Sequence, residues 1–355
     1  MKANPPASYD LIIIGLGPVG LFAANLFGKM GWSVLAIEQH EKRWPYPRAI
    51  AMDNEAFRAL QRIDLLDPIQ AQTASIGGLQ FLHQDNRVFF ETGFQIQGDF
   101  DKGPYMFYQP ELESTLEEGT KRYPNVRLQW GCKLTSFEER KNETVLCNLT
   151  PSSGEKTHLS CKYLLGCDGA NSTVRTLLGI QEQNLNYDGH ILKIDARAKD
   201  LSKLSFDAGY AQKNCSTQRA WVRMRGKDDH VRWEFQFKDS EVEDANISEA
   251  DGLQLIQETG EDISNLELIH CSFYRYRSLV QQSWREGRVL IAGDAAHLTP
   301  PYIGQGMCSG IRDIVNLSWK LEAIRKGQYA SKLLETYDAE RIPHMVHFIR
   351  VAIAV

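Results

Sequence analysis

A carboxylate directly follows a predicted buried strand in the C-terminal part of the chain. Residues 288–297 read RVLIAGDAAH, and 289–292 form a short apolar run with β character. The run ends at Gly293 and Asp294. Because glycine lets a ligand approach the backbone and a carboxylate accepts hydrogen bonds from hydroxyl groups, this pair is a candidate ligand site.

The residues that follow supply a second binding feature, a glycine-rich helix start. Residues 300–307 read PPYIGQGM, and a helix is expected to open at 304–306 and run through Leu317 and Leu321. Its unpaired N–H groups and positive dipole end suit an anion or the electron-rich edge of a heterocycle. Taken alone, these residues fit an ordinary strand–loop–helix unit equally well.

A glycine-rich turn near the other end of the chain predicts a dinucleotide site. Residues 11–14 have a buried-strand pattern, 15–20 read GLGPVG, and 21–30 have helical periodicity. A second strand, 34–37, ends at Glu38. A G-x-G-x-x-G turn is weak evidence by itself. Inside a strand–helix–strand unit, with an acid at about the expected 20-residue distance, it is specific.

Each part of this unit has a predicted task. Gly15 makes the tight turn, Gly17 lets a pyrophosphate touch the backbone, and Gly20 lets the helix pack closely on the strand. The helix N-terminus receives the phosphates, and Glu38 holds the hydroxyl groups of an adenosine ribose.

A third stretch, 163–175, again places an aspartate after a strand and before a helix. Asp168 and Gly169 follow the strand, and Arg175 lies one turn into the helix. We expect Asp168 to cap this helix and to pair with Arg175, whatever else it does.

The segments between these stretches contribute further elements. Arg48 precedes a helix expected over 53–62, with Asp53 as its cap. Its guanidinium can bind a phosphate or a carboxylate, or can simply lie in solvent. The other expected elements are a hairpin over 79–91 with its turn at 84–86, a helix over 110–123, and strands over 126–130, 144–150 and 158–165.

The region 179–280 has a different residue pattern, which predicts a second, sheet-rich domain. Residues 221–225 and 231–237 alternate as the two strands of a hairpin. One face of the second strand carries apolar side chains and the other carries Arg232, Glu234 and Gln236. We therefore expect an α/β fold in which 1–178 and 281–355 form a Rossmann-like nucleotide-binding domain and 179–280 form an inserted sheet-rich domain, whose aromatic face is either plain core or the wall of a substrate-binding site.

Composition excludes several classes of protein. Hydrophobic residues make up 43% and charged residues 24%, as in ordinary globular proteins. The net charge of −5 argues against a nucleic-acid partner. Seven cysteines without a C-x-x-C pattern predict reduced thiols and a cytoplasmic location, and residues 1–8 have no signal-peptide pattern. No apolar stretch is long enough to span a membrane, and no histidines have metal-ligand spacing.

The three stretches together resemble the signatures of the single-component FAD-dependent aromatic hydroxylases, which have the p-hydroxybenzoate hydroxylase fold. The resemblance covers roughly residues 9–341, in the order and spacing of that family. Residues 47–50 (PRAI) and 108–110 (YQP) are most similar to the branch that contains 3-(3-hydroxyphenyl)propionate hydroxylase.

The resemblance implies a set of FAD-binding residues. The fingerprint glycines would face the pyrophosphate, Asp294 would hold the ribityl hydroxyls, and Gln109 would contact the flavin side. Arg48 would contact FAD and the nicotinamide nucleotide, and the loop over 301–307 would stabilise negative charge at the flavin N1–O2 edge. The implied cofactor-binding residues are Gly15, Gly17, Pro18, Val19, Gly20, Glu38, Arg48, Gln109, Asp168, Gly169, Arg175, Gly293, Asp294, Pro301, Gly304, Gln305, Gly306 and Met307.

The same resemblance implies a reaction. NADPH or NADH would reduce FAD, O2 would add to give a flavin C4a-hydroperoxide, and its distal oxygen would pass to the ring of a phenolic substrate. A homodimer is one expected assembly. The candidates for the substrate pocket are Tyr105, Tyr108, Arg223, Tyr274 and His297, for each of which packing is the simpler interpretation. None of them is identified as the catalytic base.

Two departures from the family and two alternatives stay open. Some relatives place an acid just after the position of Arg48, where this chain has Ala49 and Ile50. Larger relatives carry a C-terminal thioredoxin-like domain, so the apolar end at 351–355 is consistent with truncation. A halogenase or epoxidase of the same fold is one alternative, although the chain lacks the W-x-W-x-I-P stretch of halogenases. An inactive FAD-binding redox protein is the other.

Overall fold

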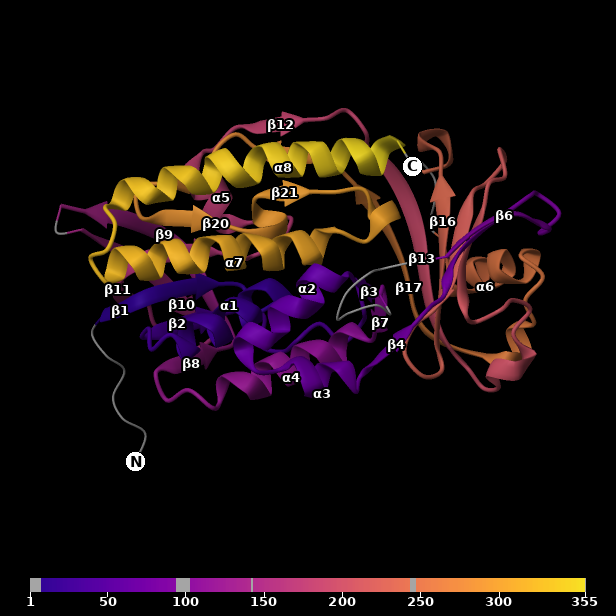
Figure 1. The fold of residues 1–355 in the computed structure, drawn as a ribbon, viewed down its shortest axis with the longest axis horizontal. Helices are drawn as coiled ribbons and strands as arrows, with labels where there is room; N and C mark the ends of the chain where they lie inside the picture. Colours follow the sequence, from indigo (N-terminus) through magenta and orange to yellow (C-terminus); the bar gives the residue numbers. More distant parts are fainter. Residues whose placement is uncertain (1–7, 94–102, 142, 243–246, 355) are drawn as a thin grey trace.

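The computed structural model describes residues 8–93, 103–141, 143–242 and 247–354, and two sheets lie end to end along its long axis (Figure 1). The N-terminal segment in which we looked for a signal peptide lies almost wholly outside these residues. Within the described ranges, no helix has both the length and the apolar character needed to cross a bilayer.

The first sheet is built on parallel strands buried on both faces. Its order is β19-β20-β11-β1-β2-β8, and β9 and β10 extend it through β11. β1 lies between β11 and β2, and all pairs from β20 to β8 are parallel. The strands are β1 (Ser8–Ile14), β2 (Val34–Ile37), β8 (Val126–Gln129), β9 (Cys132–Arg140), β10 (Thr144–Pro151), β11 (Thr157–Gly166), β19 (Arg285–Glu286) and β20 (Val289–Ile291).

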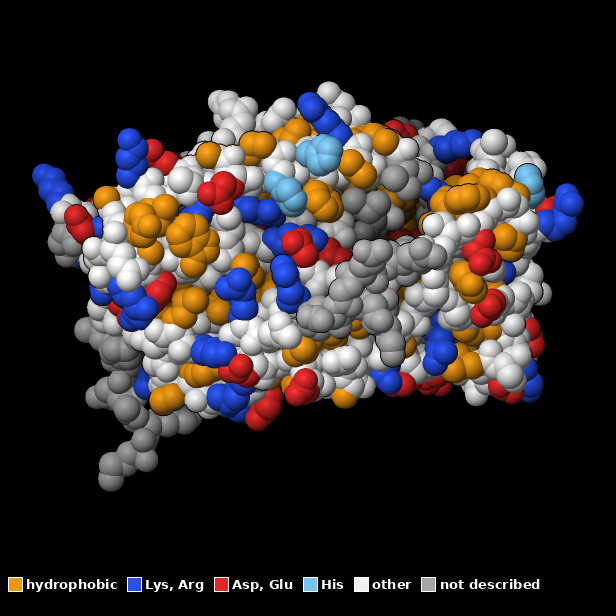
Figure 2. Space-filling view, in the orientation of Figure 1, with side chains coloured by type: hydrophobic (Ala, Val, Ile, Leu, Met, Phe, Trp, Pro, Cys, Tyr) orange, Lys and Arg blue, Asp and Glu red, His pale blue; other side chains and the backbone are white. Residues whose placement is uncertain are grey.

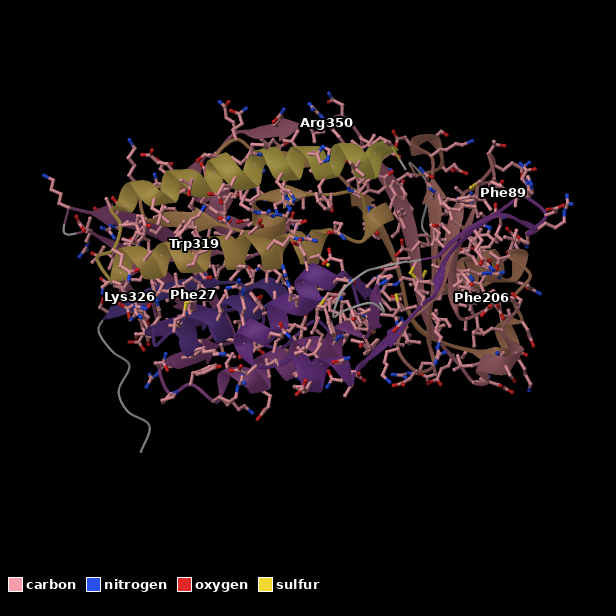
Figure 3. All side chains as sticks on the ribbon, in the orientation of Figure 1. Phe27, Phe89, Phe206, Trp319, Lys326 and Arg350 are labelled. Atoms are coloured by element: carbon pink, nitrogen blue, oxygen red, sulfur yellow. The ribbon has the colours of Figure 1, made fainter. Side chains whose placement is uncertain are left out.

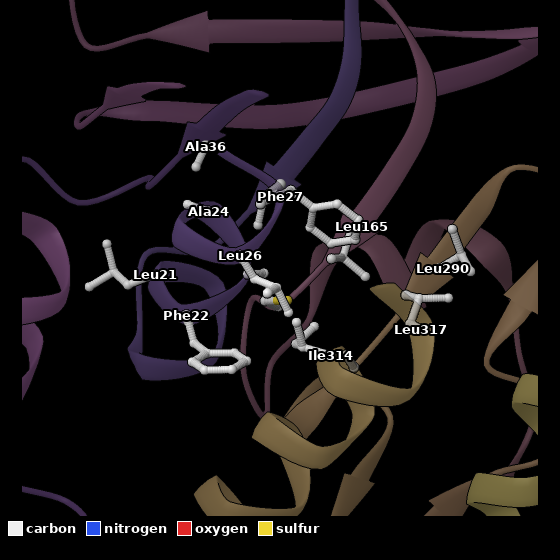
Figure 4. Close-up of a cluster of buried hydrophobic side chains, with 14 of the residues drawn as sticks. Leu21, Phe22, Ala24, Leu26, Phe27, Ala36, Leu165, Leu290, Ile314 and Leu317 are labelled. Atoms are coloured by element: carbon white, nitrogen blue, oxygen red, sulfur yellow. The ribbon is translucent and has the colours of Figure 1, made fainter. Parts of the chain in front are cut away.

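Helices α1 (Pro18–Lys29) and α7 (Gly306–Arg325) pack against each other, and α1 also contacts β1 and β2 of this sheet. Figure 4 shows their apolar side chains meeting, with Phe22 and Leu26 of α1 near Ile314 and Leu317 of α7. The apolar spacing that predicted both helices therefore forms the main core. It also brings the first and last parts of the chain into contact.

The second sheet has the order β17-β13-β16-β15-β14-β5-β6. Its strands are β5 (Gly78–Leu82), β6 (Val88–Gly93), β13 (Gly189–Ala198), β14 (Tyr210–Asn214), β15 (Trp221–Arg225), β16 (His230–Phe237) and β17 (Leu266–Tyr276). The predicted hairpin over 221–237 is confirmed as β15 and β16. Helix α6 (Glu249–Glu258) covers the apolar face, where Phe206 lies at the opposite end of the molecule from Phe27 (Figures 1 and 3).

Two features of the sheets differ from the sequence expectations. The hairpin β5–β6 was expected as an element of the region 1–178, yet β5 pairs with β14 of the second sheet. Strand β9 was not predicted, because its alternating polar residues leave only Cys132 and Leu134 fully buried. It completes an antiparallel meander with β10 and β11.

The remaining elements are helices and two small three-stranded sheets. Asp53 caps α2 by accepting a hydrogen bond from the backbone N–H of Ala56, as predicted. The expected helix over 110–123 is α4. These elements are α2 (Asn54–Ala59), α3 (Leu66–Gln70), α4 (Gln109–Thr120), α5 (Thr173–Leu178), α8 (Glu335–Ala354), the small sheet of β3 (Ala51–Met52), β7 (Tyr105–Phe107) and β4 (Thr73–Ser75), and the small sheet of β12 (Glu182–Asn184), β18 (Leu279–Gln281) and β21 (His297–Leu298).

The α/β fold with a second sheet-rich part is thus confirmed. Figure 2 shows acidic and basic side chains intermingled over the face in view, with no continuous area of one sign.

Candidate functional site

The three sequence motifs meet at the carboxyl ends of β1, β11 and β20. Gly15 lies against the backbone of Cys167 and Asp168, at the end of β11. A methyl group on Gly293 would lie 3.3 Å from Cγ2 of Val19, so the first turn of α1 also touches the end of β20. Ligands bind at this edge of open parallel sheets, because the loops there surround a crevice.

Three glycines of the first turn occupy three different environments. Gly15 has a φ of +100°, which an L side chain rarely adopts. A methyl group on Gly20 would overlap the carbonyl oxygen of Gly15, so this glycine permits the close packing of α1. A methyl group on Gly17 would meet no atom within 4 Å. The space beside Gly17 is therefore open to a ligand that touches the backbone.

The start of α1 leaves its N–H groups available to an anion. Gly17 precedes the helix without a side-chain cap, and the first turn has no acidic residue. Glu38 lies beside this turn, where its carboxylate accepts hydrogen bonds from the backbone N–H groups of Leu16 at 3.2 Å and His40 at 3.1 Å. The unpaired N–H groups and the helix dipole favour a phosphate at this end.

Asp168 accepts hydrogen bonds from the first turn of α5, although the N-cap residue of that helix is Ser172, and it does not pair with Arg175. Its carboxylate accepts hydrogen bonds from Oγ of Ser172 at 2.6 Å and from the backbone N–H of Thr173 at 2.7 Å. Arg175 instead donates to the carbonyl oxygens of Ala170, at 2.6 Å, and of Ala295, at 3.2 Å. The predicted ion pair is wrong, because the guanidinium donates instead to backbone carbonyls of the β11–α5 loop and of the loop after β20.

Asp294 is exposed to solvent at the end of β20, although neighbouring protein atoms surround its carboxylate. Its carboxylate has no hydrogen-bond partner among the described residues. The surrounding protein raises the pKa of Asp294, against the lowering effect of the nearby Arg48 and Arg175 charges. A methyl group on Gly306 would lie 3.6 Å from Oδ1 of Asp294, so the start of α7 borders the same cleft.

The start of α7 is uncapped, like that of α1. Gln305 precedes the helix without a side-chain cap, and the first turn of α7 has no acidic residue. Gly304 has a φ of +61°, and a methyl group there would meet no atom within 4 Å. Two helix N-termini therefore open on one cleft, with Asp294 between them in the chain.

Arg48 has a fixed backbone and a free side chain. Its backbone N–H donates to Oε1 of Gln109 at 2.9 Å, and its carbonyl oxygen accepts from Nη1 of Arg232 at 2.8 Å. Gln109 is buried and also donates to Glu113 at 2.7 Å, so it supports the Arg48 loop directly. The Arg48 guanidinium is exposed and has no partner within the described ranges.

His297 lies behind the cleft. Its Nε2 is 2.8 Å from Oδ2 of Asp313, which also accepts from the backbone N–H of Gly293 at 3.0 Å. Arg341 donates to the other carboxylate oxygen at 2.8 Å. This fully buried network holds the Gly293 turn in place, so His297 supports the site and does not face a substrate. Sequence reasoning missed Asp313 and Arg341, which lie on α7 and α8.

The five substrate-pocket candidates do not come together. Tyr105 stacks on Phe57 with ring centroids 3.7 Å apart and is buried. Tyr108 and Tyr274 are half-buried and lie near the polar face of the second sheet, where burial raises the pKa of each phenol. Of the five, only these two are placed to face a ligand between the sheets.

Arg223 lies on the opposite face of the second sheet. Its cross-strand partner is Trp233, on the apolar face beneath α6. Its guanidinium donates to Gln212 at 2.8 Å and to Oγ of Ser205 at 2.9 Å, and Glu261 lies 3.9 Å away. The structure therefore gives Arg223 a packing role in place of the pocket role that we expected.

A tyrosine cluster at the junction of the two sheets was not predicted. The hydroxyl of Tyr276, at the end of β17, lies 2.6 Å from that of Tyr302, in the loop before α7. The ring of Tyr187 lies 6.0 Å from that of Tyr276 and 6.3 Å from that of Tyr302. Burial raises the pKa of Tyr276 to about 12 and also raises that of Tyr302, so these two phenols are protonated at neutral pH. The three tyrosines are far apart in the sequence and share no motif.

A second unpredicted cluster consists of Lys193, Asp195, His230 and Arg232 on the polar face of the second sheet. All four are buried. Asp195 accepts from Nε of Arg232 at 2.8 Å, its Oδ1 lies 2.8 Å from Nε2 of His230, and its Oδ2 lies 3.5 Å from Nζ of Lys193. Burial would raise the pKa of Asp195, but the Arg232 charge and the His230 hydrogen bond lower it instead.

The lowered pKa of Lys193 predicts that the free energy of unfolding rises with pH. Burial, aided by Arg232 and opposed by Asp195 and Glu234, lowers the pKa of Lys193 from 10.5 to about 8. Between these values the unfolded chain binds a proton that the folded protein lacks, so the free energy of unfolding increases with pH. Lys193 should contribute at most about 3 kcal/mol across this window. Urea unfolding at pH 8 and pH 10 should show this slope in the wild type and a smaller one in Lys193→Met. Equal slopes would contradict the lowered pKa.

Comparisons with known proteins agree with this geometry. The profile of the family described as "FAD binding domain" matches residues 8–352. A 3-(3-hydroxy-phenyl)propionate/3-hydroxycinnamic acid hydroxylase of Escherichia coli is 32% identical over 350 residues, which cover 98% of this chain and 61% of that protein. The chain thus spans less than two thirds of this curated relative.

Solved structures give the same fold. The anhydrotetracycline hydroxylase OxyS of Streptomyces rimosus is 28% identical, with a TM-score of 0.78 over 98% of this chain and 68% of that chain. Aklavinone-11 hydroxylase, solved with FAD and aklavinone, is 24% identical, with a TM-score of 0.87 over 99% of this chain and 69% of that chain. Its likeness supports the fold alone. With the profile match over nearly the whole chain, these findings show that the chain belongs to the FAD binding domain family.

Proposed function

We propose that the chain is the catalytic part of an FAD-dependent monooxygenase that uses NADPH or NADH and O2 to hydroxylate a phenolic substrate. The observation that carries this proposal is the cleft on which both helix N-termini, Asp294 and Arg48 converge, beside the tyrosine cluster of Tyr187, Tyr276 and Tyr302. The Escherichia coli relative, a hydroxylase of hydroxyphenyl acids, supports the substrate class.

The residues present fit FAD. The open space beside Gly17 and the uncapped start of α1 suit its pyrophosphate. Glu38 would hold the adenosine ribose, and the unpartnered Asp294 would accept hydrogen bonds from the ribityl chain. The uncapped start of α7, with Gly304 and Gly306, suits the N1–O2 edge of the flavin ring. Bound FAD would supply hydride acceptance and oxygen activation, which no side chain provides.

The chain's own residues would bind, orient and exclude water. The positive end of α7 favours negative charge at the edge of the ring that it meets. The phenols of Tyr276 and Tyr302 remain protonated at neutral pH and can donate or accept one hydrogen bond each toward a phenolic ligand. Tyr274 and Tyr108 would form the wall on the side of the second sheet. A cytoplasmic location and a homodimer are parts of the same proposal.

Aerobic turnover with a panel of phenolic acids tests this function. NADPH and NADH oxidation, peroxide and hydroxylated product should be quantified together on the FAD-loaded protein. The expected result is oxidation that the substrate stimulates, with product equal to the nucleotide consumed. Oxidation that ends wholly as peroxide with every phenol would overturn the hydroxylase assignment and favour a flavin-binding redox protein.

Asp294 provides a direct test of the FAD assignment. Asp294→Ala should raise the Kd for FAD at least about tenfold, because the ribityl hydroxyls lose an ionised acceptor. Asp294→Asn keeps an acceptor oxygen and should lose less. Titration of flavin-free protein with FAD, followed by quenching of flavin fluorescence, gives the Kd, and Asp239→Ala at an exposed carboxylate of the second sheet is the control. An unchanged Kd in Asp294→Ala would exclude it from the FAD site.

A further inference from the structure

Two side chains of the second sheet donate hydrogen bonds to backbone carbonyl groups of the loop that precedes β3. Lys193 of β13 donates from Nζ to the carbonyl oxygen of Pro47, and Arg232 of β16 donates to the same oxygen at 3.3 Å. Arg232 also donates to the carbonyl oxygen of Arg48 at 2.8 Å. These bonds join residues that are 146 to 185 positions apart in the sequence. They act on the main chain and leave the Arg48 side chain free.

Arg48 is held from the opposite side as well. Its own N–H and that of Ala49 both donate to Oε1 of Gln109, at 2.9 Å and 2.6 Å. The peptide units on both sides of its Cα are therefore fixed, while the guanidinium is exposed and unpaired within the described residues. An arginine with a fixed backbone and a free head group is preorganised to receive an anion, because little of its main-chain freedom is lost on binding.

The two clamping cations are themselves fixed. Asp195, fully buried, lies 3.5 Å from Nζ of Lys193 and accepts from Nε of Arg232 at 2.8 Å. Nearer the start of the loop, the ring of Tyr46 stacks on His270 of β17 at 3.9 Å. The loop is thus attached at several points to one edge of the second sheet, and the buried cations provide its polar attachments.

We propose that Lys193 and Arg232 are positioning residues that hold the Arg48 guanidinium in the cleft, where it receives a phosphate of the pyridine nucleotide. This inference rests on the proposed function for the identity of that nucleotide. It assigns to the second sheet a role in nucleotide use, in addition to the substrate wall. The clamp itself, a property of the protein without ligands, does not depend on the reaction.

Anaerobic reduction of the FAD-loaded protein by NADPH tests the proposal. Lys193→Met and Arg232→Met should each raise the Kd for NADPH at least about tenfold, as expected for the loss of a preorganised charged contact. Lys193→Arg, which keeps a cationic donor, should restore most of the affinity. Reduction by dithionite should be complete in every variant. The matched control is Arg223→Met, which removes an equally buried guanidinium from the opposite face and should leave the Kd for NADPH unchanged.

Amide hydrogen exchange in flavin-free protein gives a second readout. Exchange at residues 48 and 49 should rise at least about tenfold in Lys193→Met, since local opening becomes easier, and should stay at the wild-type rate in Arg223→Met. If Arg232→Met does not fold, Arg232→Lys with Lys193→Met completes the test. Equal exchange and equal NADPH affinity in the wild type and the clamp variants would overturn the proposal. If neither NADPH nor NADH reduces the wild type, the proposed function fails, and hydrogen exchange still decides whether the clamp exists.

Discussion

Gly17→Ala should fold like the wild type and lose FAD, whereas Gly20→Ala should lose both its stability and FAD. The two glycines are three residues apart in the same turn, but their surroundings differ. A methyl group at Gly17 would meet no protein atom within 4 Å, and its φ of −72° with ψ of −178° suits alanine. The added methyl would occupy the space in which we place the pyrophosphate, so the Kd for FAD should rise at least about tenfold.

Gly20→Ala acts on the fold itself. Its methyl group would overlap the carbonyl oxygen of Gly15, which belongs to the backbone and cannot rotate away. Helix α1 would have to move off the turn, and its apolar side chains make the core with α7 (Figure 4). Overpacking of this kind should lower the free energy of unfolding by about 3 kcal/mol.

Thermal unfolding and FAD titration of both variants separate the two effects. The expected pattern is a wild-type Tm with a weakened FAD affinity for Gly17→Ala, and a reduced Tm for Gly20→Ala even without flavin. Gly93→Ala, at an exposed glycine of the second sheet that also lacks a positive φ and where a methyl group would meet only the carbonyl oxygen of Gly77 at 3.8 Å, controls for the general cost of replacing glycine. Normal FAD binding by Gly17→Ala would remove the pyrophosphate from this turn.

The parts of the fold that the sequence predicted are those with a local cause. A run such as 11–14 must be buried on both faces, and a glycine at 15 and at 20 is needed for the turn that follows, so the strand, turn and helix could be predicted together. The same holds for the helix after Gly304. In each case the residues that specify the structure are neighbours in the chain.

The polar clusters could not be predicted, because their partners are distant in the sequence. Alternation in 231–237 placed Arg232 and Glu234 on one face of a strand, and a polar face is most often solvated. Here that face lies against the first domain, and Arg232 is 1% exposed. Nothing in a single strand shows whether its polar side meets water or a loop that contains Pro47.

The position of Arg223 on the apolar face could have been predicted from the sequence. The short turn between β15 and β16 fixes the register of the hairpin, in which Arg223 faces Trp233 and Trp221 faces Phe235. Cross-strand partners share a face. Since Trp233 and Phe235 were already assigned to the apolar face, the register places Arg223 beside them in the core and away from the cleft.

Asp195→Ala should be among the most destabilising single substitutions in the second sheet. The carboxylate is fully buried and is the counterion of Arg232, which is equally buried. Its removal takes away the hydrogen-bonded carboxylate of a buried guanidinium and leaves only Glu234, 3.7 Å from Nη1 of Arg232, as an ion-pair partner among the described residues. Breaking a buried pair from one side costs about 3–5 kcal/mol. The pKa of Asp195, lowered by the charge of Arg232 against the effect of burial, has the same origin.

The sign of the pH dependence follows from that shift. Because the folded protein binds the Asp195 proton less readily than the unfolded chain does, the stabilising contribution is complete above the ordinary aspartate pKa and is lost as the pH falls below it. Wild type and Asp195→Asn should therefore differ most at neutral pH, and the difference should shrink on acidification below about pH 4.

Urea unfolding followed by tryptophan fluorescence measures these differences, since Trp233 lies on the same strand as Arg232. The matched control is Asp229→Ala, which breaks the exposed pair between Asp229 and Arg197 at the end of the same strands and should cost less than about 1 kcal/mol. Equal losses in the two variants would mean that Asp195 acts as a surface charge does. A larger loss in Asp195→Ala, accompanied by faster hydrogen exchange at Arg48, would tie the stability of the buried cluster to the loop that it holds.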